Sequence, residues 1–138
     1  MNLIPAVDIT SGALAAQKMR LDIVAQNIAN AQTTHTPQGG PYQRQVVSFE
    51  TELVKRTGGV SLQSVRIGGV NPDPTPGESI HNPQHPDANA EGVVKMPNVN
   101  LAFEMVDLIS ASRAYEANLN VIETARAIEA RTLDILKK

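Results

Sequence analysis

The longest continuous pattern in the chain lies at its C-terminal end, from Asn98 to Lys138, where there is neither a glycine nor a proline. Alanine, leucine, isoleucine, glutamate and arginine dominate this segment, and such residues lose little conformational freedom in a helix. The segment therefore predicts one helix, on the order of 60 Å long at about 1.5 Å per residue. A helix of that length cannot be covered by itself and needs partners.

Apolar residues in this segment recur every seven positions, which is the spacing of a coiled-coil seam. The first series, with its intervening positions, is Leu101, Met105, Leu108, Tyr115, Leu119 and Ile122. A second series with the same spacing begins beyond Tyr115. It lies one position earlier in the seven-residue repeat than the first series, and nearby leucines widen it. Its members are Val121, Ile128, Leu133, Ile135 and Leu136. The apolar surface covers more than one face of the helix, which favours packing against several neighbours.

A second helix is predicted near the N-terminus, from about Ile4 to Ala31. Its apolar residues at the same spacing are Val7, Leu14, Leu21 and Ile28. Gly12 lies in its middle and costs about 1 kcal/mol relative to alanine in a helix. This helix would be roughly 40 Å long and can pair with only part of the longer one. The apolar end of the longer helix is therefore expected to contact another molecule.

The middle of the chain changes to short strands and proline-rich segments. Short alternating runs between Tyr42 and Ile67, separated by Gly58-Gly59, predict a β-hairpin. A change of phase after Leu62 predicts a bulge or a crossover to the other face of the sheet. Five prolines between Asn71 and Pro86 predict an extended connector. Gly92 to Met96 predict one more short strand.

The predicted fold is mainly α. Two long terminal helices pair as an α-helical coiled coil, joined by a small β and extended, proline-rich middle region. Residues 1–36 with 97–138 would form the helical domain, and residues 37–96 the β and extended region. The chain has two tyrosines, two phenylalanines and no tryptophan. So few aromatic side chains suit helix packing better than a thick globular core.

Charge and targeting signals narrow the class of partner. The net charge of −2 provides no broad attraction to nucleic acid or to an anionic membrane. No long apolar stretch predicts a membrane span, and the segment from Met1 to Gln17 lacks the pattern of a secretory signal peptide. There is no cysteine, so a disulfide framework is impossible. Partners are expected to be recognised by shape and apolar contact.

Candidate chemistry is sparse. His81, His85 and Asp87 could be offered as metal ligands, because imidazole and carboxylate groups are common ligands. The proline-rich chain around them has no regular element to fix their geometry, so local turn formation is the preferred interpretation. The glycine pairs lack the spacing of a phosphate loop. We expect no catalytic residues, no cofactor and no metal.

The remaining motifs lie along nearly the whole chain. They are Ser11-Gly12, Asn27-Ile28-Ala29-Asn30-Ala31, Thr33-Thr34, Gly39-Gly40-Pro41-Tyr42, His85 to Val94, Pro97-Asn98-Val99-Asn100 and Ser112 to Asn118. Together they resemble the motifs of the flagellar basal-body rod proteins, within the wider rod and hook family. Gln32 stands where the family motif usually has asparagine, and Val93 where an aromatic residue is common.

The resemblance implies a non-enzymatic subunit of the proximal rod, the part of the flagellar drive shaft that crosses the bacterial periplasm. It implies assembly with copies of itself and with other rod proteins. It also implies uncleaved delivery by the flagellar export apparatus, without nucleic-acid binding or membrane insertion. The residues expected in the helix pair are Val7, Leu14, Leu21, Ile28, Leu101, Leu108, Tyr115, Leu119 and Ile122. The resemblance nominates polar positions that set the packing register: Asn27, Asn30, Arg113, Tyr115, Glu116 and Asn118. Leu133, Ile135 and Leu136 are expected to contact neighbouring subunits.

Two alternatives of other classes remain open from the residues. One is a small export chaperone or adaptor that binds a single partner through its coiled coil. The other is a metal-dependent enzyme built on His81, His85 and Asp87. The extended β and proline-rich middle favours a subunit that spans between neighbours.

Overall fold

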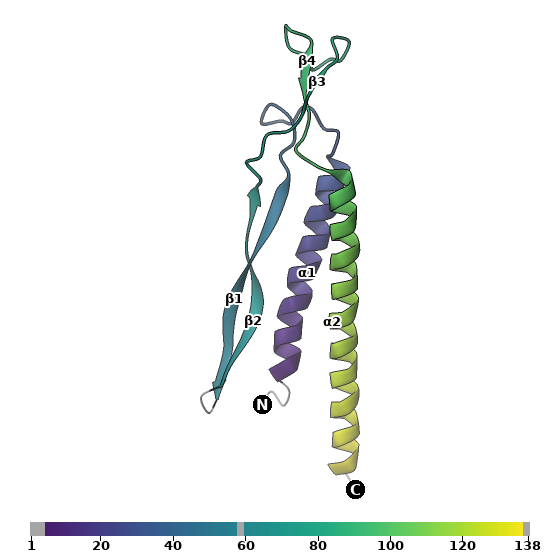
Figure 1. The fold of residues 1–138 in the computed structure, drawn as a ribbon. Coiled ribbons are helices and arrows are strands. Elements are labelled where there is room, and N and C mark those ends of the chain that lie inside the picture. Colours follow the sequence, from purple (N-terminus) through teal and green to yellow (C-terminus); the bar gives the residue numbers. More distant parts are fainter. Residues whose placement is uncertain (1–4, 58–59, 137–138) are drawn as a thin grey trace.

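Two helices and two small antiparallel sheets make up the protein in this computed structural model, which describes residues 5–57 and 60–136. The helices are α1 (Pro5–Ala29) and α2 (Leu101–Leu136). Between them lie β1 (Gln45–Thr57), β2 (Val60–Pro72), β3 (Ser79–His81) and β4 (Val93–Lys95). The predicted terminal helices and the β character of the middle are confirmed (Figure 1).

The first helix is the central layer of the molecule. It contacts α2 on one side and both strands of the β1–β2 hairpin on the other, as Figure 1 shows. Arg20 of α1 pairs with Asp107 of α2, and Asn27, farther along α1, bonds with Glu104, which lies earlier on α2. The two helices therefore run antiparallel.

Small and polar side chains occupy the most buried positions of the helix pair. Ala16 is 2% exposed and Ala111 is fully buried, as expected where two helix backbones approach closely. Val24 and Ile122 add larger apolar contacts at 4% and 9% exposure. The contact between the helices therefore relies on close approach more than on large apolar side chains.

The β1–β2 hairpin carries the predicted change of phase as a bulge. Leu53 pairs with Gln63 while Lys55 pairs with Leu62, so Val54 is the extra residue, and it lies on the first strand. A second irregularity lies between Ser48 and Phe49. The predicted turn at Gly58-Gly59 lies outside the described residues.

Gly12 has a tertiary reason to be a glycine. A methyl group there would overlap the Oγ atom of Ser64 and lie 2.9 Å from the carbonyl oxygen of Val65, both on β2. Ser64 also donates a hydrogen bond of 3.2 Å to the carbonyl oxygen of Ile9. The loss in helix propensity at Gly12 therefore permits the hairpin to lie directly on α1.

The proline-rich segment is only partly a connector. The segment predicted to be extended from Asn71 to Pro86 contains the end of β2 and all of β3. Pro72 can end a strand because the last residue need not donate to the ladder. The β3–β4 sheet forms a tip beyond the end of α1 (Figure 1). Gly92, with a φ of 73°, makes the turn that leads into β4.

The exposed surface is larger than a compact chain would have. Its accessible area is 9734 Å², whereas a folded monomer of 14.8 kDa is expected to expose about 7000 Å². Sixteen large apolar side chains are exposed among the described residues, against five apolar side chains that are buried. The isolated chain therefore leaves much of its apolar surface uncovered.

Candidate functional site

A partly buried polar junction joins α1, α2 and the chain around β1. It consists of the buried Asn27 and Glu104 and the half-buried Tyr42, Arg44 and Asp73. Asn27 is 1% exposed and lies at its centre. Its Nδ2 donates to the carbonyl oxygen of Gln45 at 2.9 Å, and its Oδ1 accepts from the amide nitrogen of the same residue at 2.9 Å. The Tyr42 hydroxyl donates to Oδ1 at 2.8 Å. A single side chain thus holds the start of the hairpin against the end of α1.

The same asparagine reaches across to α2. Its Nδ2 donates to Glu104 Oε2 at 3.1 Å, and Arg44 Nε donates to Glu104 Oε1 at 2.6 Å. The Glu104 side chain is 1% exposed, so this pair is shielded from water on the carboxylate side. Arg44 also pairs with Asp73 at 3.4 Å. Removing one member of such a pair leaves a buried charge uncompensated.

The charges of the junction are reflected in its pKa values. Burial, followed by the nearby charge of Glu104, raises the pKa of Tyr42 above its ordinary value. Burial alone would lower the pKa of Arg44, but its bonds and attraction to Glu104 and then Asp73 outweigh that effect and raise it. Hydrogen bonds from Thr75, and then Arg44, lower the pKa of Asp73. The junction therefore favours a neutral tyrosine, a charged arginine and a charged aspartate.

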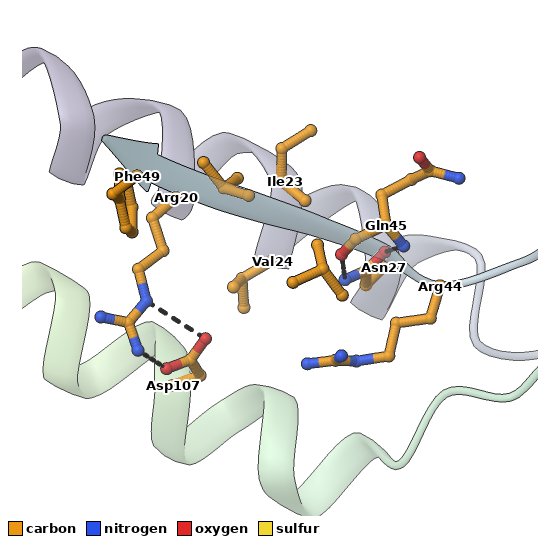
Figure 2. A pocket seen from close by; sticks show the side chains of 10 residues that line it. Arg20, Ile23, Val24, Asn27, Arg44, Gln45, Phe49 and Asp107 are labelled. Atoms are coloured by element: carbon orange, nitrogen blue, oxygen red, sulfur yellow. Dashed lines mark hydrogen bonds and ion pairs between the residues drawn. The ribbon is translucent and has the colours of Figure 1, made fainter. Parts of the chain in front are cut away.

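A groove of about 270 Å³ lies beside the junction, between β1 and α2, with α1 as its floor. Figure 2 shows Ile23 and Val24 of α1 in this groove, with the Arg20–Asp107 pair at one end and Arg44 at the other. The second contact of the pair joins Arg20 Nε to Asp107 Oδ2 at 3.3 Å. Phe49 lines the β1 side and is 40% exposed. The groove is apolar along its floor and closed by charges at its ends.

The nominated polar residues separate into two groups. Asn27 lies in the junction, whereas Asn30 is local: its Nδ2 donates to the carbonyl oxygen of Gln26, and its Oδ1 accepts from Thr33. Arg113 and Glu116 are exposed on α2, beyond Asp107 and therefore opposite the first half of α1. Asn27 bonds with Glu104, Tyr42 and Gln45, and none of these three was among the nominated polar residues. The role of Arg113, Tyr115, Glu116 and Asn118 in setting register stays a prediction.

The apolar residues expected in the helix pair also differ in placement. The members on α1 are all half-buried: Val7, Leu14, Leu21 and Ile28. On α2, Leu108 and Tyr115 are half-buried and Ile122 is buried, while Leu101 and Leu119 are 49% and 41% exposed. The intervening positions that face α1 carry Glu104, Ala111 and Asn118. A prediction based on the spacing of large apolar side chains could not identify polar and small residues at these positions.

A second apolar face of α2 is left uncovered within the chain. Its members are Phe103, Val106, Val121, Ile128 and Ile135, with exposures between 48% and 75%. Phe103 and Val121 are about five helical turns apart, so they point in the same direction. The C-terminal half of this face consists of three members of the second series predicted from the sequence: Val121, Ile128 and Ile135.

The C-terminal end of α2 extends past the beginning of α1 (Figure 1). Ile128, Leu133 and Ile135 lie in this region and are 56%, 48% and 75% exposed. Leu136 is the last helical residue. The predicted mismatch in helix length is therefore present, and the side chains of Ile128, Leu133 and Ile135 are open to contact. The expected contact of the Leu136 side chain lies outside the described part of the structure.

The candidate metal ligands His81, His85 and Asp87 lie in the β3–β4 tip. Within residues 5–57 and 60–136, no three His, Cys, Asp or Glu side chains come together as possible metal ligands. Asp87 instead accepts a hydrogen bond of 2.6 Å from Thr34 and lies 3.9 Å from His85. In that same part of the chain, neither helix is long and apolar enough to cross a membrane. The ligand set of the metal-enzyme alternative is therefore not assembled.

Arg44 and Glu104 were missed by the sequence reasoning. One signal was available: Glu104 and Asp107 are isolated acids in the otherwise apolar run from Leu101 to Ile109. Charges within an apolar run are rarely buried unless they are paired. Nothing in the sequence identified Arg44 as the partner.

Comparison with known proteins shows to which protein family the chain belongs. The family model described as "Flagella basal body rod protein" matches residues 8–34, and "Flagellar basal body rod FlgEFG protein C-terminal" matches residues 90–135. The flagellar basal-body rod protein FlgC of Agrobacterium fabrum is 43% identical over 135 residues, covering 96% of this chain and 94% of that protein. The chain belongs to the FlgC family of flagellar basal-body rod proteins.

Two other FlgC proteins are similar over nearly their whole length. That of Salmonella typhimurium is 39% identical over 135 residues, covering 98% of both chains. That of Borreliella burgdorferi is 38% identical over 152 residues, covering 99% of both. The chain is a structural rod subunit of the flagellar basal body. The two matched family regions cover most of α1 and α2.

Proposed function

We propose that this rod subunit polymerises through its terminal helices, with copies of itself and with other rod proteins, into the proximal rod. The observation that carries the proposal is the end of α2, which continues past α1 with Ile128, Leu133 and Ile135 exposed. Exposed apolar side chains gathered at one end of a helix mark a contact with another molecule more readily than single scattered ones do.

The size of the uncovered surface supports the same conclusion. The chain exposes about 2700 Å² more than a compact monomer of its mass would. A standard protein interface buries about 800 Å² on each partner. Several contacts of that size would be needed to cover the excess. An adaptor with one closed contact would leave most of it in water.

Two separate apolar faces on α2 support an open array. One face packs on α1, and the other, from Phe103 to Ile135, is available to a neighbour. A contact between two different surfaces of identical subunits extends into an open helical array unless the rotation between subunits closes it into a ring. We propose that residues 1–36 and 97–138 form this assembly domain, paired as a coiled coil, and that residues 37–96 form the β region attached to it.

The proposed place of the subunit is the proximal rod where it crosses the periplasm. The proposed route is the flagellar export apparatus, without cleavage of a signal peptide. Similarity to FlgC proteins over nearly the whole chain supports the location in the rod, because those relatives are named as basal-body rod proteins.

Truncation of α2 tests the proposal. Deleting residues 132–138 removes Leu133, Ile135 and Leu136 but retains the part of α2 that packs on α1. We expect normal synthesis and export, no completed rods and no motility in a strain that carries only this version. Functional flagella built by the truncated protein would contradict the proposal.

A pair of neighbouring substitutions provides the matched control. Ile135→Asp places a charge on the exposed apolar face and should prevent assembly, whereas Asp134→Asn, on the adjacent exposed residue, should not. Equal effects of the two substitutions would argue against an apolar contact at this end. A purified protein that forms only a closed dimer with one soluble partner would favour the adaptor.

A further inference from the structure

The β3–β4 tip is joined to the rest of the molecule by two chain segments that cross at one place, here called the neck. The neck consists of residues 73–78, which lead into β3, and residues 96–98, which leave β4. The backbone amide of Met96 donates to the carbonyl oxygen of Glu78 at 2.8 Å. This bond continues the pairing of β3 with β4 toward the helices.

Asn98 binds two backbone groups in the neck and one on Arg44, outside it. Its Nδ2 donates to the carbonyl oxygens of Asp73 at 3.1 Å and Thr75 at 2.9 Å. Its Oδ1 accepts from the amide nitrogen of Arg44 at 2.8 Å. The amide nitrogen of Asp73 in turn donates to the Arg44 carbonyl oxygen at 2.7 Å. The Asn98 side chain therefore connects both neck segments to Arg44, a member of the polar junction.

Gly77 allows the two neck segments to touch. A methyl group at this position would overlap the carbonyl oxygen of Met96 and lie 3.0 Å from the carbonyl carbons of Met96 and Pro97. The obstacle is backbone on a neighbouring segment, so it cannot be relieved by rotation of a side chain. Any side chain at Gly77 must push the segments apart.

A second contact holds the tip from its side. The hydroxyl of Thr34, in the chain that follows α1, donates to Asp87 Oδ2 at 2.6 Å. Asp87 belongs to the loop between β3 and β4. The two neck segments cross at one place, and the Thr34–Asp87 contact holds the tip from its side. Together these contacts restrict both bending and rotation of the tip.

We propose that Asn98 and Gly77 are positioning residues that fix the direction of the tip relative to the helix pair, and thereby set which neighbour the tip meets in the rod. The second part rests on the proposed polymerisation; the first does not. Ile80 on β3 is 47% exposed, so the direction of the tip decides where an apolar side chain is presented.

Spin-label distances in the dilute, full-length protein test the first part. The chain has no cysteine, so paired cysteines can be introduced without background. One pair, at Gln84 in the tip loop and Glu116 on α2, reports the direction of the tip. A second pair, at Lys18 on α1 and Glu116, reports the helix pair. All three positions are exposed.

We expect Gly77→Val and Asn98→Ala to shift or broaden the tip-to-helix distance while the distance between the helices stays as in the parent. Gly69→Ala is the control, because its methyl group would meet its nearest atoms at 3.7 Å, an ordinary contact. An unchanged tip distance in both variants would overturn the proposal. So would an equal change in the helix distance, which would make the residues general determinants of folding.

Motility separates this inference from the proposed function. Gly77→Val, expressed at the parental level, should prevent rod completion, and Gly69→Ala should not. If the tip is displaced in the dilute protein but rods still form, the orienting role in assembly is wrong while polymerisation through the helices stands. If deletion of residues 132–138 leaves rods intact, polymerisation through the helix end is wrong while the spin-label result is unaffected.

Discussion

The side-chain amide of Asn27 donates to the carboxylate of Glu104 across 3.1 Å, although 77 positions separate the two residues in the chain. Both side chains are 1% exposed. This contact connects the end of α1 to the beginning of α2 at the point where the hairpin also starts. Two polar contacts, Asn27 with Glu104 and Arg20 with Asp107, therefore join the antiparallel helices in the half of α1 nearest the hairpin start.

Asn27→Ala should lower the free energy of unfolding by about 2–4 kcal/mol, because it leaves several buried groups without their partner. Asn30→Ala removes only local bonds at the end of α1 and should cost about 1 kcal/mol or less. Urea unfolding followed by circular dichroism measures both values. Equal costs for the two asparagines would mean that the junction does not carry the stability assigned to it.

Ile122→Asp and Ile128→Asp compare the two apolar faces of α2 with the same change of residue. Ile122 is 9% exposed and packs within the chain, so a charge there should cost several kcal/mol, about 3 or more, in the monomer. Ile128 is 56% exposed, and its substitution should change monomer stability by only about 0.5 kcal/mol. Both should block rod formation. A strongly destabilised Ile128→Asp monomer would show that this face is covered within the chain.

The sign of the stability change caused by Gly12→Ala distinguishes helix propensity from tertiary contacts. Helix propensity alone predicts that alanine would stabilise α1 by about 1 kcal/mol. The overlap of the added methyl group with Ser64, and its 2.9 Å approach to the carbonyl oxygen of Val65, predict destabilisation instead. We expect a lower melting temperature. A higher melting temperature would show that the hairpin can move off α1 at little cost.

Acid should weaken the junction through Asp73. Its pKa lies below the ordinary value of 3.8, because Thr75 and then Arg44 favour the charged carboxylate. The resulting stabilisation is present above the unfolded-state pKa and is lost as the pH falls through the lowered folded-state pKa. Asp73→Asn should therefore reduce the loss of stability on acidification below about pH 4. The urea concentration at the midpoint of unfolding, compared between the parent and the variant from pH 6 downward, measures this loss.

Thr75→Val is the matched variant for this titration. It removes the hydroxyl that donates to Asp73 at 2.6 Å but leaves the carboxylate in place. The pKa of Asp73, followed by NMR, should move back toward its ordinary value. An unchanged pKa would assign the shift to Arg44 and to the backbone amide of Thr75 instead.

Sequence periodicity predicted the two helices, the mismatch in their lengths and the second apolar series beyond Tyr115, because these depend on residues close together in the chain. Sequence alone could not pair Arg44 with Glu104, since that contact depends on how β1 and α2 are brought together. Gly12 looked like a local cost for the same reason: Ser64 and Val65, which explain it, lie on a distant strand. The role of Gly77 could not be predicted from the sequence, because the backbone that it touches belongs to Met96, on a separate segment of the chain.

The orientation of the two faces of α2 in the assembled rod is the most direct test of this account. Electron cryomicroscopy of intact basal bodies from cells that make this protein would show it. We expect rod density that fits antiparallel α1 and α2, with Phe103, Val121, Ile128 and Ile135 covered by neighbouring subunits and Asn27 bonded to Glu104 inside each subunit. Rod subunits whose second α2 face points into solvent, or whose helices have separated at Asn27 and Glu104, would contradict the account.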